Sequence, residues 1–308
     1  LNLIKKIFSK LFRNYFEKKL IMIGRSHLLS ARQNYKNIQN LNDLDYKIFS
    51  QFGEDGIIDY LLKSLNISSP KFVEIGVGDF SECNTRYLFE TTQPKGLIID
   101  CIENFEQKVK KNINLWKGDL TIIQKKINSK NVIDILKQKN FLNDLDLFVI
   151  DIDGIDYWVM KNLPKNLSKI IVVEYNATFG PDLEVTVPDL EDFDRSKYHY
   201  SNLCFGASLK AYVKLLDQMG YVFIGTSISK INAFFINKNE LNKISLKNLP
   251  DSNDLSFYTK SNIRESRNKN GKLNFLNNST KIEEIKNCDV IDLSNNKEKK
   301  KQISELIN

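Results

Sequence analysis

The stretch KFVEIGVGD, residues 71–79, decides the fold expected for this chain. Its first half is a short β-prone run that contains one carboxylate, Glu74, and its second half is a Gly-x-Gly turn formed by Gly76 and Gly78. A strand that runs into such a turn brings bare backbone N–H groups to the carboxyl edge of a sheet, where anionic and nucleoside ligands bind. We therefore expect residues 72–77 to be the first strand of an α/β domain, and the turn to cradle a cofactor.

Strands and helices alternate after this stretch, and this alternation predicts a Rossmann-like, doubly wound, mostly parallel sheet. Further strands are expected at 95–100, 120–127, 145–150, 170–173, 221–225 and 233–236. A helix is expected over 207–219, ending at Gly220. The link between the last two strands is too short for a crossover helix, so these strands are expected to form an antiparallel hairpin.

Three segments are predicted along the chain. They are a basic amphipathic helical leader at 1–48, the α/β domain at 49–240, and a polar, Asn- and Lys-rich extension at 241–308. Within the domain, about 177–206 is expected to form a lid, because long stretches without periodicity inside compact domains are usually functional. The charge run at 297–301 is expected to be solvated and partly disordered.

The leader carries the charge imbalance of the chain. Residues 1–50 hold ten Lys and Arg against three acids, an excess equal to the net charge of +7 of the whole chain. Because the remainder is balanced, we expect no nucleic-acid partner. The apolar stripe of residues 1–20, opposite lysines, leaves alternatives open: packing on the body, homodimerisation, or peripheral contact with an anionic membrane surface.

The amino-acid composition indicates which broad classes of protein this chain can belong to. The content of 42% hydrophobic and 27% charged residues is ordinary for a soluble globular protein, and no apolar run reaches the roughly 18 residues that span a bilayer. The four cysteines lack CxxC pairing, so we expect no disulfide framework and no structural zinc. The expected location is cytoplasmic, with peripheral attachment at the inner face of the membrane as the alternative.

The glycine turn, the acid two positions before its first glycine and the closing hairpin resemble the class I S-adenosylmethionine-dependent methyltransferases. Within them, the FkbM-like and related sugar O-methyltransferases are the most similar. The resemblance covers roughly 49–236, and the third glycine of the family falls at Phe80 here. It implies S-adenosyl-L-methionine as cofactor, and methyl transfer to a hydroxyl of a nucleotide-sugar or a surface glycan.

The resemblance also implies a set of cofactor-binding residues. Glu74, Gly76 and Gly78 would contact the cofactor, and Asp100 would take the ribose, as an acid about 20–25 residues after a Gly-x-Gly turn does in nucleoside-binding α/β folds. The further expected cofactor contacts are Gln51, Glu54, Asp79, Asn84, Thr85 and Asp151. For Glu54 the alternative role is to cap the helix that begins near it.

Four polar residues lie at or just beyond the carboxyl ends of the strands expected at 145–150 and 170–173. They are Asp151, Asp153, Glu174 and Asn176. Because adjacent strands lie about 4.8 Å apart, these oxygens are expected to converge, and an all-oxygen set suits Mg²⁺, Mn²⁺ or Ca²⁺ rather than zinc. The alternative is that Asp151 and Asp153 cap the next helix and Glu174 orients the substrate without a metal.

Methyl transfer needs an aligned, deprotonated acceptor hydroxyl. His199, in the expected lid, is the candidate base at neutral pH, and Asp153 and Glu174 are its rivals. Two other functions stay open. A nicotinamide-dependent sugar oxidoreductase or epimerase would need Ser81 to replace a glycine, and a catalytically inactive, membrane-docked protein could share this fold.

Overall fold

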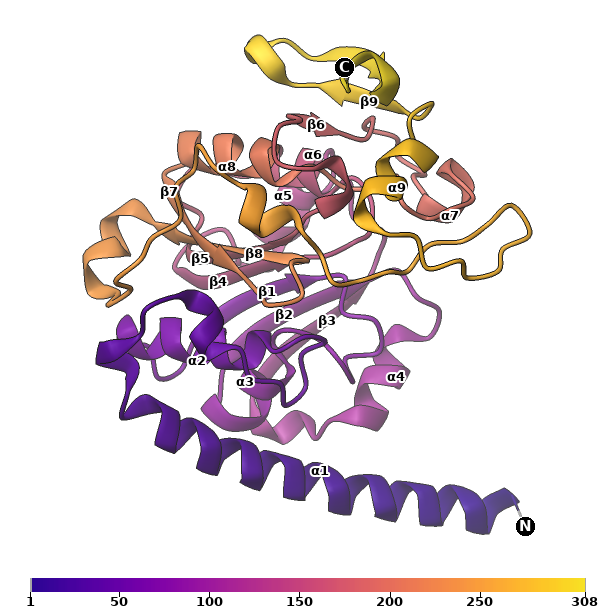
Figure 1. Ribbon diagram of the computed structural model, residues 1–308. Coiled ribbons are helices and arrows are strands. Elements are labelled where there is room, and N and C mark those ends of the chain that lie inside the picture. Colours follow the sequence, from indigo (N-terminus) through magenta and orange to yellow (C-terminus); the bar gives the residue numbers. More distant parts are fainter. Residues whose placement is uncertain (1, 308) are drawn as a thin grey trace.

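The computed structural model describes residues 2–307, except for the side chains at 2–11, 13, 14 and 296. Its central sheet has the strand order β3-β2-β1-β4-β5-β8-β7 (Figure 1). The strands are β1 Lys71–Ile75, β2 Lys95–Asp100, β3 Asp119–Gln124, β4 Leu145–Ile150, β5 Ser168–Glu174, β7 Tyr221–Thr226 and β8 Asn232–Asn237. Strands β1 to β5 are parallel, and β8 runs antiparallel to both β5 and β7. The expected Rossmann-like sheet with its antiparallel closing pair is confirmed.

Helices cover both faces of this sheet (Figure 1). Those on one face are α2 Glu54–Ser64, α3 Arg86–Thr92 and α4 Phe105–Asn112, and those on the other are α5 Val132–Gln138, α6 Asp156–Asn162 and α8 Leu209–Gln218. Successive strand side chains point to opposite faces, so Phe72 packs with the first set of helices and Val73 with the second. The sheet is therefore buried on both faces, which explains the near-continuous apolar runs that marked its strands in the sequence.

The order of the strands creates a switch point between β1 and β4. From β1 the chain moves outward to β2 and β3, then returns to form β4 on the other side of β1. Ligands of open α/β sheets bind in the crevice outside the carboxyl ends of the strands at such a point. The glycine turn after β1 and the acids after β4 both lie at this edge.

The leader forms a helix longer than the predicted stripe, α1 Asn2–Arg32. Its carboxyl half packs on the body, with Leu28 buried and Arg32 paired with Asp59 at 2.5 Å. Farther toward the amino terminus it exposes large apolar side chains, including Phe12, Tyr15, Phe16, Met22 and Ile23. Part of the predicted stripe, at 1–11, lies outside the described side chains. Among the described residues, no helix combines the length and the apolar character needed to cross a bilayer. Membrane or dimer contact through this segment stays a prediction.

The C-terminal extension has regular secondary structure, which includes most of the charge run at 297–301 that was expected to be partly disordered. It contains α9 Asn278–Glu284 and the strands β9 Asp289–Asp292 and β10 Lys299–Gln302. These strands pair antiparallel with each other, and β9 also pairs with β6, Val185–Thr186, from the lid (Figure 1). The apolar residues that anchor the extension are Ile285, Val290, Leu293 and Ile303. The lysine run thus forms an edge strand, in which Lys300 and Lys301 pair with Asp289 and Asp292 of β9, and charged side chains are a common way to protect a sheet edge.

Candidate functional site

A cavity of about 1220 Å³ opens at the carboxyl ends of β1, β2, β4 and β5. The lid contributes to its wall through Arg195 on α7, Arg195–Tyr198, and the C-terminal extension contributes Ser261, Ile263 and Lys281. The predicted site residues that line it are Gln51, Gly76, Gly78, Asp79, Asp100, Asp151, Asp153, Glu174 and Asn176. The parallel sheet therefore brings together residues that are more than a hundred positions apart in the sequence.

The glycine turn and Asp100 form one wall of this cavity. Both glycines have positive φ, +86° at Gly76 and +57° at Gly78, a region that glycine enters at little cost. The Gly78 N–H donates to Asp100 Oδ2 at 2.8 Å, and the Ile102 N–H donates to Oδ1 at 3.0 Å. These bonds hold the Asp100 carboxylate at the cavity wall, and each oxygen keeps a lone pair for a further donor.

Glu74 lies behind this wall and does not line the cavity, so its predicted direct contact with a cofactor does not fit its placement. It accepts hydrogen bonds from the N–H groups of Asn84 and Thr85, both at 2.9 Å, and from the Thr85 hydroxyl at 2.5 Å. Burial raises the pKa of Glu74, while the hydrogen bonds from Thr85 and Asn84 act in the opposite direction. Glu74, Asn84 and Thr85 therefore tie β1 to the start of α3 and hold the turn between them.

Phe80 occupies the position where the resembled family has its third glycine. It adopts the left-handed conformation that glycine favours, with φ +63°. That conformation costs a non-glycine residue roughly 1 kcal/mol or more, and here the aromatic ring is fully buried, edge to face with Phe89. Burial of a Phe side chain stabilises by about 1.5–3 kcal/mol, which offsets the strain, so the turn keeps its shape without the third glycine.

Arg86 supports the glycine turn from behind the cavity wall, and no sequence pattern indicated this role. Its guanidinium is buried and donates to the Phe80 carbonyl at 2.8 Å and the Asn112 carbonyl at 2.6 Å, and it pairs with Glu90 at 3.1 Å. It also lies 4.8 Å from the centre of the Phe49 ring. A single arginine at the start of a helix carries no pattern that marks it as buried, yet it holds the end of the glycine turn.

The segment before α2 places Gln51 in the cavity wall but not Glu54. The buried Glu54 carboxylate accepts from the Phe52 N–H and from the Asn232 side chain, both at 3.0 Å. Glu54 therefore stabilises the chain at the start of α2, as the capping alternative implies, and does not contact the space where a cofactor would bind. Its neighbour Asp55 accepts from three backbone N–H groups, those of residues 48–50, while burial raises its pKa to about 6.

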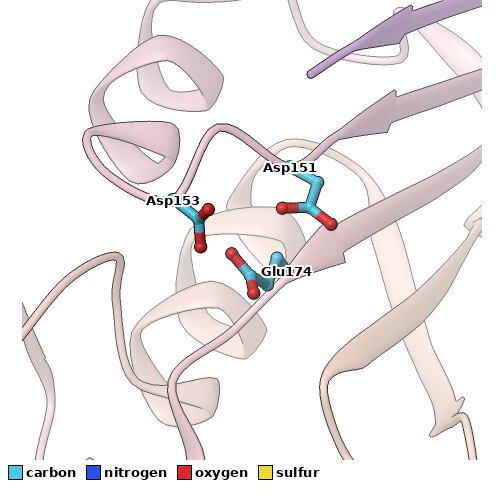
Figure 2. Close-up of side chains that lie close together, drawn as sticks. All are labelled: Asp151, Asp153 and Glu174. Carbon is cyan, nitrogen blue, oxygen red and sulfur yellow. The ribbon is translucent and has the colours of Figure 1, made fainter. Parts of the chain in front are cut away.

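Asp151, Asp153 and Glu174 converge at the other side of the switch point (Figure 2). One oxygen of each lies within 4.8 Å of the others. Desolvation raises the pKa of both Asp151 and Glu174 well above the ordinary range, and their mutual repulsion and that of Asp153 reinforce the rise for Glu174. Asp151 and Glu174 are hydrogen-bonded to each other, so this pair retains a proton where isolated carboxyl groups would have lost it.

The capping alternative for Asp151 and Asp153 is wrong, because another acid holds the loop before α6. Asp156 accepts from the Ile152 N–H at 2.8 Å and the Gly154 N–H at 2.9 Å, and the residue that precedes the helix provides no side-chain cap. Asp153 instead has φ +54° and forms an ion pair with Arg195 of the lid. Arg195 thus partly neutralises the acid cluster.

Asn176 and His199 do not take their predicted roles. The Asn176 amide donates to the carbonyls of Leu203 and Phe205, and its oxygen accepts from the Thr178 N–H, so it shapes the lid rather than presenting an oxygen to a metal. His199 is absent from the cavity wall, and its Nδ1 lies 2.7 Å from the Ser201 hydroxyl. Burial lowers its pKa. Asp153 and Glu174 remain as the candidate bases.

Comparisons with known proteins give a likeness in structure but not in sequence. No family model and no curated protein matches the chain. Among solved structures, the chain is similar to human N-acetylserotonin methyltransferase in complex with S-adenosylmethionine, with 14% identity and a TM-score of 0.33 over 57% of this chain and 49% of that one. A small RNA methyltransferase matches with 14% identity and a TM-score of 0.36 over 59% of this chain and 25% of that one. Spermidine synthase from Thermotoga maritima matches with 12% identity and a TM-score of 0.34, covering 78% and 70%.

These likenesses are too distant to carry an argument about activity. The chain covers only a quarter of the small RNA methyltransferase and about half of the human enzyme.

Proposed function

We propose that this protein is an S-adenosylmethionine-dependent O-methyltransferase that methylates a hydroxyl of a sugar, either in a nucleotide-sugar or in a surface glycan. One observation carries the proposal: the glycine turn with Asp100 and the acid cluster of Asp151, Asp153 and Glu174 line the same cavity. A nucleoside site and a proton-accepting site therefore share one space. The mostly parallel sheet with its antiparallel closing pair is also the arrangement of the resembled methyltransferases.

The residues at the β1 and β2 ends fit the cofactor. The space beside Gly78 is open, since a Cβ built there would meet no atom within 4 Å. Asp100 is already oriented by two backbone N–H groups and can accept from ribose hydroxyls. S-adenosylmethionine supplies a methyl group on a positively charged sulfonium, and a wall that contains Asp79, Asp100 and Asp151 favours a cation.

The residues at the β4 and β5 ends fit the acceptor. As the acceptor oxygen forms its bond to the methyl carbon, the carbon–sulfur bond breaks and the hydroxyl proton must leave. Asp153 or the Asp151–Glu174 pair can take that proton, because all three carboxyl groups face the cavity. The polar lid side chains of Asp192, Asp194 and Asn202 line the same space and suit a polyhydroxylated acceptor.

The acid cluster also fits a divalent cation. Three oxygens bound to Mg²⁺ at about 2.1 Å in octahedral geometry lie about 3–4 Å apart, which is within the 4.8 Å limit of the cluster. Asp151, Asp153 and Glu174 would hold the ion, and such an ion lowers the pKa of a hydroxyl bound to it. Without an ion, the proton on the Asp151–Glu174 pair and the Arg195 guanidinium limit the repulsion.

The first prediction concerns the cofactor. S-adenosylhomocysteine at about a hundred times its dissociation constant should stabilise the protein by about 2.7 kcal/mol by mass action, which corresponds to several degrees in melting temperature. Asp100→Asn keeps the shape of the side chain but removes its charge, so it should weaken this binding by about tenfold or more. Thermal unfolding followed by circular dichroism, with and without the ligand, measures both effects.

The same assay separates the alternatives. A shift with NAD⁺ or NADP⁺ and none with S-adenosylhomocysteine would favour the oxidoreductase or epimerase. Ser81, where a nicotinamide fingerprint needs glycine, instead donates its N–H to Asp79 at 3.0 Å. S-adenosylhomocysteine binding without turnover on any sugar acceptor would favour the inactive protein that retains this fold.

The second prediction concerns the metal. Mg²⁺ or Mn²⁺ should raise the melting temperature of the wild-type protein, and Asp151→Asn should abolish that rise. In the absence of metal, Asp151→Asn should melt at the same temperature as the wild type or higher, because it relieves repulsion between buried carboxylates. Asp217→Asn, at an exposed carboxylate outside the cavity, is the matched control. Full methyl transfer in EDTA, together with an equal metal response of wild type and Asp151→Asn, would refute a required ion at this cluster.

A further inference from the structure

Two lysines are buried in the wall of the cavity. Lys230 is 9% exposed and Lys281 is 4% exposed, and both line the cavity. A buried ammonium is costly unless it is paired, and lysine is among the residue types that are least often fully buried. Their positions therefore call for an explanation beyond packing.

Lys230 lies in the turn between β7 and β8, in a left-handed conformation with φ +61°. Its Nζ donates to the Phe257 carbonyl and lies 3.4 Å from the centre of the Phe257 ring. An ammonium can donate more than one hydrogen bond, and within residues 2–307 this one has no carboxylate partner. Burial lowers the pKa of Lys230, and the nearby Lys260 lowers it further.

Lys281 repeats this arrangement on α9. Its Nζ donates to the Ile263 carbonyl, and the described side chains again provide no carboxylate for it. Burial lowers its pKa, and the charge of Arg264 adds to the effect. A backbone carbonyl could be satisfied by a neutral donor at lower cost, so anchoring the chain does not account for a charge at both positions.

Both lysines belong to the acceptor side of the cavity. In the pairing of β5 with β8, Glu174 faces Asn232, and the next residue, Tyr175, donates its N–H to the Ile231 carbonyl. Lys230 therefore lies just beyond the end of β5. The helix α9 packs beside the turn at Ala177–Phe179, which follows β5 as well. Asp100 and the glycine turn are on the other side of the switch point.

We propose that Lys230 and Lys281 form a binding site for an anionic group of the methyl acceptor, a phosphate or a carboxylate. The assignment of this ligand to the acceptor rests on the proposed function, whereas the anion site itself rests on the two lysines. A phosphate or a carboxylate would provide the charged partner that neither ammonium has. The acids at the strand ends repel the same group, so the acceptor would bind with its anion at the lysines and its reacting hydroxyl at Asp153 and Glu174.

This orientation narrows the acceptor class. A neutral sugar would leave both ammonium groups buried without a counter-charge. A sugar phosphate, a nucleotide-sugar or a uronic acid would supply one, and these acceptors share an anion close to a ring of hydroxyls. The chemistry thus favours a charged sugar over a neutral glycan.

Titration of the full chain at constant ionic strength tests the site, with pyrophosphate and glucuronate as probes and glucose as the neutral comparison. At least one of the two anions should bind saturably in calorimetry, and the one that binds tighter identifies phosphate or carboxylate as the natural group. Lys230→Met and Lys281→Met should each weaken that binding by about tenfold or more, as expected for a lost charged hydrogen bond. Lys137→Met removes an exposed lysine of α5 outside the cavity and should change nothing.

Anion affinities equal in the wild type and both cavity variants would overturn the proposal, as would an equal loss in Lys137→Met. If Lys281→Met fails to fold, reductive methylation of the lysines in the wild-type protein tests the anion site instead. Pyrophosphate or glucuronate should slow labelling of Lys230 and Lys281 but not of Lys137, and absence of that protection counts against the site. S-adenosylhomocysteine binding is measured on the same samples. A protein that does not bind this ligand is therefore distinguished from one that does not bind the anion.

Discussion

Replacing Arg86 with methionine is expected to lower the free energy of unfolding by about 3 kcal/mol, the low end of the cost of breaking a buried ion pair, because Glu90 keeps Lys117 as a second partner. Arg86 and Glu90 are both almost fully buried, with side chains only 1% and 3% exposed. The substitution also removes the donors to the Phe80 and Asn112 carbonyls. Because the free energy of unfolding of a whole domain is only about 5–15 kcal/mol, this one substitution should remove a large fraction of it.

Lys110→Met is the matched control for Arg86→Met. Lys110 forms an ion pair of the same helical spacing with Glu106, at 2.5 Å, but both of these side chains are about half exposed. Exposed pairs of this kind contribute about 0.3–0.5 kcal/mol. Urea denaturation of both variants gives the comparison directly, and equal losses would show that burial of the Arg86 pair does not matter to stability.

Gly76→Ala is expected to destabilise the protein by about 3 kcal/mol or more, whereas Gly78→Ala should cost only about 1 kcal/mol. Both residues have positive φ, so both alanines carry the same conformational penalty. A Cβ at position 76 would lie 1.6 Å from the Asp151 carbonyl oxygen, but at position 78 it would meet no atom within 4 Å. The clash at Gly76 is with backbone, so the chain just after β1 would have to move away from the chain just after β4.

The same denaturation experiment tests this pair of variants. Gly78→Ala should fold, which makes it usable for ligand binding, and its response to S-adenosylhomocysteine should shrink if the added methyl group occupies cofactor space. A Gly76→Ala protein as stable as Gly78→Ala would contradict the close approach of the Asp151 carbonyl.

The corrections at the site share one physical cause. Glu74 and Asn176 lie near strand ends and Glu54 begins α2, yet the polar atoms of all three satisfy backbone N–H and C=O groups of neighbouring loops. A buried loop must find partners for its backbone, and short polar side chains provide them. Which acid faces the cavity and which supports the wall depends on loop paths that the sequence pattern does not encode.

The ordered C-terminal extension escaped prediction for a related reason. Its polar composition gave no periodic apolar face, but a few buried residues, such as Val290 and Ile303, anchor it against the lid. The pairing of β9 with β6 joins segments about a hundred residues apart. Such contacts gain their energy only in the folded chain, so local sequence does not announce them.

What the sequence determined by itself is the sheet and the edge at which its site lies. β-branched runs, helical periodicity and the Gly-x-Gly turn are local signals, and they sufficed for the strand positions of the central sheet, for its antiparallel closing pair and for the convergence of Asp151, Asp153 and Glu174. Only the tertiary structure decided the burial of Arg86, Lys230 and Lys281. Whether a single charged residue is exposed or buried depends on which distant segments fold over it, and no short-range pattern carries that information.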